Sequence, residues 1–300
     1  MMKREKVEIT WRSIKGWLWT LFLLGVDAVM LSGGASTTAG INILAFIISM
    51  TGSAFLCVFG EWIVRRQYHA VKTSNVVGGE RLERIFSEVQ TEAAKVNPYF
   101  KIWPAEVYVV PGQEINAFAA GSSTVMITEA SLQLDAGYQK ALLAHELGHL
   151  AAGHGCMSLM IAANIMFLSV GYLVTRFIAV VVAVILSLVC FSTSRQGLFS
   201  FFAAGRVGEV VAWVLDSIQN MYVTALDLVV AKLKRGCEYD ADWFAARCGY
   251  GRLLRQVLMQ FASQEPEEGV RLRERLFAEH PGYEDRIRQL TAMIYNNGGT

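Results

Sequence analysis

The chain has 300 residues, of which 53% are hydrophobic and 18% are charged, and its mean hydropathy is +0.36. Soluble proteins carry about 25% charged residues on average, so this composition excludes an ordinary soluble enzyme and indicates membrane segments. The formal net charge is +1 and no basic stripe with interleaved aromatic residues occurs, so we expect no nucleic acid as a partner.

The pattern of residues 16–60 predicts a transmembrane hairpin. The apolar stretches 16–32 and 41–60 are each close to the roughly 20 residues that cross a bilayer, and a short uncharged turn separates them. Basic residues flank the hairpin on both sides, so the positive-inside rule predicts that both flanks, including residues 1–15, are cytoplasmic. Asp27 would be costly against lipid, and we expect it to face other helices or a functional site.

Two stretches rich in β-branched residues, Glu106 to Val110 and Thr124 to Thr128, predict short strands. Residues typical of turns border them, namely Pro111-Gly112 and Gly121-Ser122-Ser123. The sequence therefore predicts a small sheet in this part of the chain.

A predicted helix follows and carries the run Ala144-His145-Glu146-Leu147-Gly148-His149, a match to H-E-x-x-H. Four helical positions bring the second imidazole to within about 40° of the first, so both rings can bind one metal ion. A catalytic zinc needs three protein ligands and one open position for water, and Glu146 can take a proton from that water. The motif predicts metal-assisted peptide hydrolysis, whereas the alternative is the polar face of an ordinary helix.

Residues 157–191 form a third apolar block, which only Arg176 interrupts. The block is too long for one untilted crossing and barely long enough for two. If a third metal ligand lies downstream, it must be on the same side of the membrane as His145. The chain between His145 and that ligand must therefore cross the membrane an even number of times. One solution is a tight hairpin that turns near Arg176, and the other is one long helix with a return through residues 198–230. Residues 198–230 have an amphipathic pattern, which is more typical of a helix at the membrane interface or packed on protein than of a lipid-exposed span. This pattern favours the hairpin.

Two candidates can complete the metal site. Glu238 and Asp242 share a face of a helix predicted to begin after Gly236, where Glu238 can bind zinc and Asp242 can accept a hydrogen bond from a ligand imidazole. The alternative is an acidic first helical turn. His154 competes as third ligand, but it lies five residues after His149, and on a continuous helix about 140° of rotation turns it away from the metal.

These features resemble the HtpX-type integral-membrane zinc metallopeptidases, which are relatives of the CAAX prenyl endopeptidases. The resemblance spans most of the chain in the family's order: a hairpin, His145-Glu146-x-x-His149, a hydrophobic insertion and Glu238-x-x-x-Asp242. Asn116-Ala117-Phe118-Ala119 resembles the family's N-A-F-A signature, and His280-Pro281 with Arg286-Ile287 resembles its C-terminal motif. The resemblance implies one Zn²⁺ per chain, held by His145, His149 and Glu238, with Glu146 as the general base and Asp242 beside a ligand.

The resemblance also suggests supporting roles for three residues. In the family the small sheet lies above the active-site cleft, where an edge strand can pair with an extended substrate. Asn116 would contact the substrate or order that strand, and the alternative is a purely structural role in a turn. Arg286 would pair with Asp242 or lie near the oxyanion, and His280 is the weaker candidate. In the family a hydrophobic segment lies close to the residue that corresponds to Glu238, which favours the return through residues 198–230. Because the amphipathic pattern of those residues favours the hairpin instead, the sequence does not decide which segments make the second pair of crossings.

The expected fold is a mainly α membrane protein with about four transmembrane helices and an α+β zincin (gluzincin) catalytic domain that carries a small β-sheet. Residues 61–156 and 231–300 would form the two parts of that domain, and residues 157–230 the insertion. We expect a multi-pass protein of the inner or plasma membrane that cuts membrane or misfolded proteins on the cytoplasmic side, as quality control. The alternatives are a CAAX-type prenyl-protein protease, whose relatives carry more spans, and a non-catalytic metal-binding scaffold, which would need no Glu146.

Overall fold

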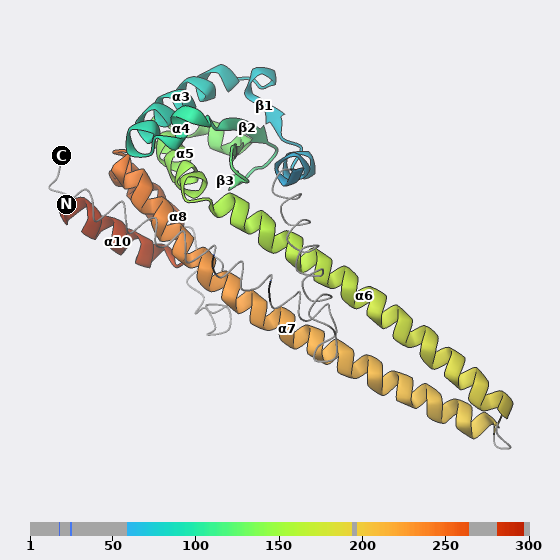
Figure 1. The fold of residues 1–300 in the computed structure, drawn as a ribbon. Coiled ribbons are helices and arrows are strands. Elements are labelled where there is room, and N and C mark those ends of the chain that lie inside the picture. Colours follow the sequence, from blue (N-terminus) through green and yellow to red (C-terminus); the bar gives the residue numbers. More distant parts are fainter. Residues whose placement is uncertain (1–17, 19–24, 26–58, 194–196, 264–280, 297–300) are drawn as a thin grey trace.

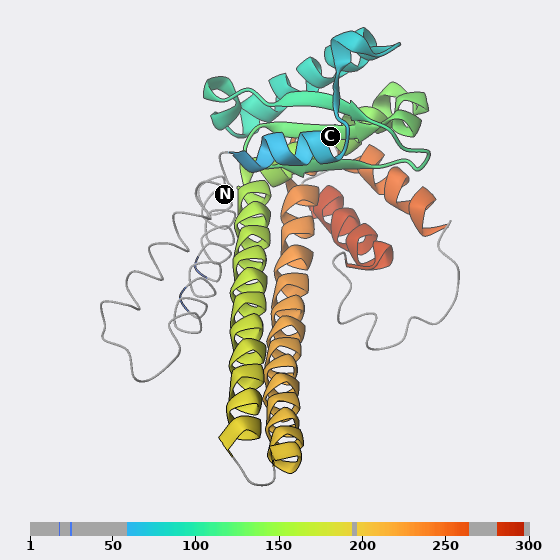
Figure 2. The ribbon, with the colours of Figure 1, turned by 90° about the vertical axis from the view of Figure 1, so that its right-hand side faces the viewer.

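The computed structural model describes residues 18, 25, 59–193, 197–263 and 281–296. Within these ranges a head of helices and strands lies at one end of two long antiparallel helices (Figures 1 and 2). Nearly all of the predicted hairpin, with Asp27, lies outside the described residues, as does His280. The structure therefore bears on the catalytic head and on the insertion.

The head contains a four-stranded mixed sheet in the order β1-β2-β4-β3. The strands are β1 (Val71–Lys72), β2 (Glu106–Val110), β3 (Ala117–Ala120) and β4 (Thr124–Thr128). The two strands predicted from β-branched residues are β2 and β4, which pair in parallel, and β3 pairs antiparallel with β4 at the edge of the sheet. The predicted small sheet is confirmed. Its edge strand β3 begins directly after Asn116 and is rich in alanine, and these small side chains give no strand signal in the sequence.

The helices of the head share a core with one face of the sheet or pack against the helices that do. They are α3 (Gly79–Val96), α4 (Tyr99–Ile102), α5 (Ala136–Ala151), α8 (Gly251–Ala262) and α10 (Tyr283–Asn296), with short 3-10 turns at Thr73–Asn75 and Glu129–Gln133. Leu82 of α3, Val125 of β4 and Leu147 of α5 are fully buried in one hydrophobic core. On the opposite face Tyr108 and Met126 pack against the helical segment 59–67. The site helix α5 is thus fixed by the main core.

The two long helices are α6 (His154–Thr193) and α7 (Gly197–Arg247). A tight hairpin near Arg176 is wrong, because α6 runs through that residue without a break and the chain returns along α7. The helix that carries Glu238 does not begin after Gly236, because Glu238 lies within α7. Gly236 lies within α7 and does not adopt the positive φ of a glycine that ends a helix.

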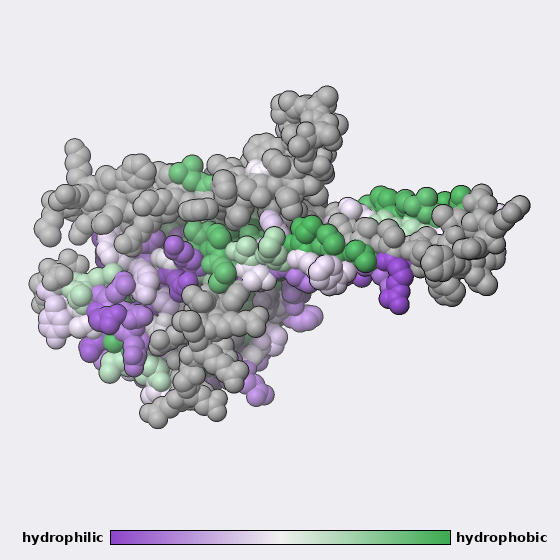
Figure 3. Space-filling view, turned by 90° about the horizontal axis from the view of Figure 1, so that it is seen from below, coloured by the Kyte–Doolittle hydropathy of each residue, from purple (hydrophilic) through white to green (hydrophobic). Residues whose placement is uncertain are grey.

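The distal part of α6 is apolar and exposed. In α6 the segment Tyr172–Val189 is long and apolar enough to cross a membrane, and only 6% of it is buried within the molecule. Among the described residues it is the one segment that meets this test. Figure 3 shows hydrophobic residues along the extended helices and hydrophilic ones over much of the described surface of the head. The predicted count of four crossings includes the N-terminal hairpin and is not tested by these residues.

Candidate active site

The site forms where α5 crosses α7 at close range. Gly148 of α5 permits this approach, because a Cβ at that position would lie 2.8 Å from the Cα of Ala241 and 3.0 Å from the Cβ of Phe244. No side chain fits between backbones at such distances, whereas glycine leaves the space open. The close crossing places Glu238 of α7 opposite the two histidines of the H-E-x-x-H motif.

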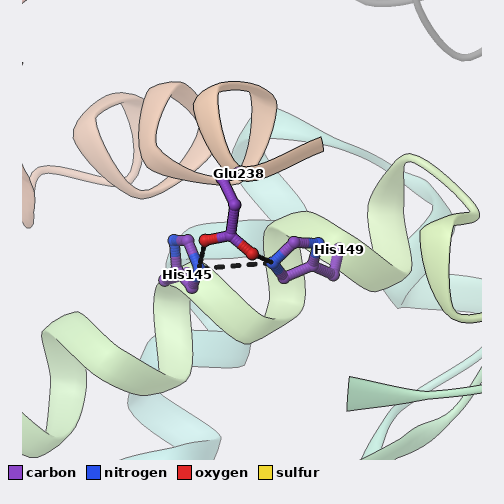
Figure 4. A group of neighbouring side chains, drawn as sticks. All are labelled: His145, His149 and Glu238. Atoms are coloured by element: carbon purple, nitrogen blue, oxygen red, sulfur yellow. Dashed lines mark hydrogen bonds and ion pairs between the residues drawn. The ribbon is translucent and has the colours of Figure 1, made fainter. Parts of the chain in front are cut away.

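His145, His149 and Glu238 converge from the two helices (Figure 4). Their ligand atoms form a triangle: the two Nε2 atoms are 3.2 Å apart, and the Glu238 oxygens lie 3.4 Å from His145 Nε2 and 3.6 Å from His149 Nε2. Ligands at zinc's usual bond lengths of about 2.0–2.1 Å, arranged as a tetrahedron, are about 3.3–3.4 Å apart. Two imidazoles and one carboxylate at these separations therefore fit a zinc ion.

Asp242 and Arg286 lie directly behind this triangle. Asp242 Oδ1 is 2.9 Å from His145 Nδ1, and Arg286 donates to both oxygens of Asp242, at 2.8 and 2.6 Å. The third guanidinium nitrogen of Arg286, Nη1, lies 2.9 Å from Glu238 Oε2. The family resemblance suggests two positions for Arg286, paired with Asp242 or near the oxyanion. In the structure Arg286 pairs with Asp242.

The electrostatics of the site favour a cation. Burial alone would lower the pKa of His145, but its contacts with Asp242 and Glu238 outweigh burial and raise that pKa to about 10. Arg286 and, to a lesser extent, His145 lower the pKa of Asp242 despite its burial, so this carboxyl stays ionised. The carboxylates of Asp242 and Glu238 thus favour positive charge around His145, whereas burial lowers the pKa of His149 well below its usual value and keeps that ring neutral, as a metal ligand must be.

Glu146 is buried next to the triangle with 6% of its surface exposed. Burial is the main cause that raises its pKa to about 7, and the Glu238 carboxylate adds to the rise. The backbone N–H of Ala119 in the edge strand β3 hydrogen-bonds to the Glu146 carboxylate. A carboxyl that titrates near neutrality can both accept and return a proton, which suits a general base.

The site opens into a cleft of about 890 Å³. The edge strand β3 forms one wall, with Asn116 just before it, and Leu254, Leu258 and Phe261 of α8 form an apolar wall. The backbone N–H of Asn116 donates to Ser131 Oγ at 2.9 Å, and its carbonyl accepts from the Thr128 N–H at 3.0 Å. The backbone of Asn116 thus orders the strand, while its side chain is exposed at the cleft.

His154 is not part of the ligand triangle, but the expected reason for this is wrong. The helix is not continuous: α5 ends at Ala151, Gly153 adopts a left-handed φ of 75°, and α6 begins at His154. This break returns His154 to the site, where its Nδ1 lies 3.2 Å from His149 Nδ1. A glycine shortly after a helical run is a known signal for a helix end and could have indicated the break.

Glu61 supports the site from farther away and has no signal in the sequence. Its buried carboxylate accepts hydrogen bonds from the backbone and hydroxyls of Ser122 and Ser123 and from the hydroxyl of Thr124. Ser122 and Ser123 lie in the turn between β3 and β4, and Thr124 is the first residue of β4. Burial alone would raise the pKa of Glu61, but the hydrogen bonds outweigh it and lower the pKa. The end of the predicted membrane hairpin is thereby connected to the strand that reaches Glu146.

Comparison with known proteins places this geometry in a family. The model of peptidase family M48 matches residues 79–294, which include the three metal-binding candidates, Glu146, Asp242 and Arg286. The crystal structure of Ste24p from S. mikatae aligns over 84% of this chain and 57% of its own, with a TM-score of 0.48 and 14% identity.

Curated relatives match along nearly the whole chain. Protease HtpX of Chromohalobacter salexigens is 28% identical over 302 residues, which cover 92% of this chain and 93% of that protein. The Protease HtpX homolog of Desulfotalea psychrophila is 25% identical, with coverage of 91% and 95%, and Protease HtpX of Hahella chejuensis is 24% identical, with coverage of 91% and 92%. The chain therefore belongs to peptidase family M48, as a membrane metallopeptidase of the HtpX type.

Proposed function

We propose that this protein is a membrane-embedded zinc endopeptidase that cleaves membrane or misfolded proteins on the cytoplasmic side, in protein quality control. The observation that carries the proposal is the triangle of His145, His149 and Glu238 with edges of 3.2 to 3.6 Å, next to the buried carboxyl of Glu146. A metal site with a structural role alone needs no proton acceptor at its side, so Glu146 favours catalysis.

The proposed reaction is the hydrolysis of a peptide bond. His145, His149 and Glu238 would hold a zinc ion, which when bound supplies Lewis acidity that lowers the pKa of water and polarises a carbonyl oxygen. Glu146 takes a proton from the attacking water as its oxygen bonds to the carbonyl carbon, and it gives that proton to the amine nitrogen as the C–N bond breaks. Asp242 holds the ring of His145, and Arg286 balances the charge of Asp242 and Glu238.

The edge strand β3 supports a role in binding an extended substrate. The N–H of Thr128 donates to the carbonyl of Asn116, so this pair is hydrogen-bonded, and alternation along an antiparallel ladder directs the N–H of Ala117 away from β4. The N–H of Ala119 also points outward, but it is directed to Glu146. Outward backbone groups at a sheet edge can pair with a peptide strand. We propose that substrate adds to β3 and that the Asn116 side chain contacts it.

The membrane arrangement belongs to the same proposal. The exposed apolar part of α6 supports a crossing by α6 and α7, which together with the predicted N-terminal hairpin gives four spans. Both α5 and the later part of α7 then lie on the cytoplasmic side, as the positive-inside rule predicts for the flanks of the hairpin. An alkaline phosphatase reporter fused after residue 195 should be active, whereas one fused after residue 300 should be inactive. The reverse result would overturn this orientation.

The decisive experiment compares Glu146→Gln with the wild type, both purified as the full chain in detergent and loaded with zinc. We expect Glu146→Gln to keep one zinc per chain and to lose cleavage of β-casein, because the amide cannot accept the proton. Glu129→Gln is the matched control, since Glu129 is exposed outside the cleft, and it should cleave as the wild type does. Cleavage by Glu146→Gln at the wild-type rate would overturn the mechanism.

A further inference from the structure

The imidazole of His154 lies against a metal-binding candidate without belonging to the ligand triangle. It is buried, with 6% of its surface exposed, at the first residue of α6. The left-handed turn at Gly153 brings it next to His149. The two rings meet at an interplanar angle of 65° with their centroids 5.4 Å apart, so they contact edge to face and do not stack.

The two nitrogens of His149 have different surroundings. Nε2 faces the ligand triangle, 3.2 Å from His145 Nε2 and 3.6 Å from Glu238 Oε1. Nδ1 faces the opposite way and lies 3.2 Å from His154 Nδ1, within hydrogen-bond distance. His149 therefore presents Nε2 to a metal ion and Nδ1 to His154.

This division determines where the protons lie when a metal is bound. A neutral imidazole that binds a metal through Nε2 carries its proton on Nδ1, and that N–H needs an acceptor. For His145 the acceptor is the carboxylate of Asp242, at 2.9 Å. For His149 the contact recorded among the described residues is His154 Nδ1, which can accept only if the proton of His154 lies on Nε2.

We propose that His154 is a positioning residue that accepts a hydrogen bond from His149 Nδ1 and thereby orients the second histidine ligand. The inference rests on the zinc site of the proposed function. The two ligand histidines then differ, because His145 donates to an anion and His149 to a neutral ring. A neutral acceptor adds no further negative charge to a site that already contains Glu146, Glu238 and Asp242. Because a carboxylate raises the basicity of a ligand imidazole more than a neutral ring does, His149 is the weaker electron donor of the two histidines.

The first test measures zinc affinity by competition with a chelator in the full chain, for the wild type and for His154→Phe, His154→Asn and His154→Asp. Loss of a partner that orients a metal ligand typically weakens affinity about 10–100-fold, which we expect for His154→Phe. His154→Asp should bind within about threefold of the wild type, since a carboxylate is the usual partner of a ligand histidine, and His154→Asn should lie between the two. The melting temperature of each zinc-free variant reports whether it is folded.

Two outcomes of the affinity measurements overturn the proposal. Equal zinc affinity in a folded His154→Phe variant would show that the contact does not orient the ligand, and complete loss of zinc from all three folded variants would make His154 itself a ligand. If His154→Phe does not fold, ¹⁵N-histidine NMR of the zinc-loaded wild type decides: we expect protons on His149 Nδ1 and His154 Nε2, and a proton on His154 Nδ1 contradicts the proposal. A wild-type chain that binds no zinc overturns the proposed function instead.

Discussion

Arg286 and Asp242 form a buried two-point ion pair, with Nε to Oδ2 at 2.8 Å and Nη2 to Oδ1 at 2.6 Å. Both side chains are at least 93% buried, and Oδ1 of Asp242 also contacts His145. The pair joins α10, the last described helix, to the ligand helices α5 and α7. The fold of the C-terminal region and the orientation of His145 are therefore coupled through one arginine.

Replacement of Arg286 by glutamine should impair both stability and metal binding. Removal of one partner of a buried ion pair typically costs about 3–5 kcal/mol, because the remaining charge is buried and unpaired. Asp242 would also lose its fixed orientation, so zinc affinity should fall about 10–100-fold. Thermal unfolding and chelator competition measure the two effects.

Arg288→Gln provides the matched control for this prediction. Arg288 lies on the same helix, but its side chain is 79% exposed and pairs with Asp285 at the surface. Exposed pairs contribute about 0–1 kcal/mol, so this variant should retain stability and zinc affinity. Equal effects of the two substitutions would show that Arg286 does not act through Asp242.

Replacement of Gly148 by alanine tests the close crossing of α5 and α7. The added Cβ would meet the backbone of Ala241 at 2.8 Å, so the helices must separate and Glu238 must move away from the histidines. We expect zinc affinity to fall by about 10-fold or more, since ligand positions within about 0.5 Å determine a metal site. Gly137→Ala in the same helix is the control, because its Cβ would make an ordinary 3.5 Å contact with Leu253 and should leave zinc binding unchanged.

The features that followed from sequence are local or periodic. The bounds of β2 and β4 follow from β-branched residues, and the shared face of Glu238 and Asp242 follows from helical spacing. The predicted helix start after Gly236 is wrong, because a helix tolerates a single glycine when tertiary packing supports it. The contact between Glu61 and Ser122 joins residues 61 positions apart, and no local pattern encodes it.

Replacement of Ala119 by proline tests the link between the edge strand and Glu146. The N–H of Ala119 points away from β4 toward Glu146, so proline removes that hydrogen bond and spares the ladder within the sheet. Small displacements of a catalytic group cost about 100-fold in rate, and we expect a fall of this order in kcat/KM for casein, with zinc content unchanged. Ala119→Gly keeps the N–H and should retain most of the activity. A proline variant as active as the glycine variant would contradict the role of this N–H.

Replacement of Glu61 by glutamine should destabilise the head in a pH-dependent way. Five hydrogen bonds from Ser122, Ser123 and Thr124 hold the pKa of Glu61 below its usual value of 4.5, so the ionised carboxylate stabilises the folded state. Hydrogen bonds to a charged group contribute about 1.5–3 kcal/mol, and Glu61→Gln should lose an amount of this order at pH 7.

The sign of the pH dependence follows from the lowered pKa. The stabilisation is fully present above the unfolded pKa of about 4.5 and is lost as the pH falls through the lower folded pKa, because protonation then removes the charge from the wild type as well. The difference in melting temperature between the wild type and Glu61→Gln should therefore be constant from pH 8 to pH 6, about 1.5 units above that pKa, and shrink below about pH 4.5. Glu83→Gln on the exposed side of α3 should show no such difference at any pH. A gap that persists unchanged at low pH would mean that Glu61 acts through its shape and not through its charge.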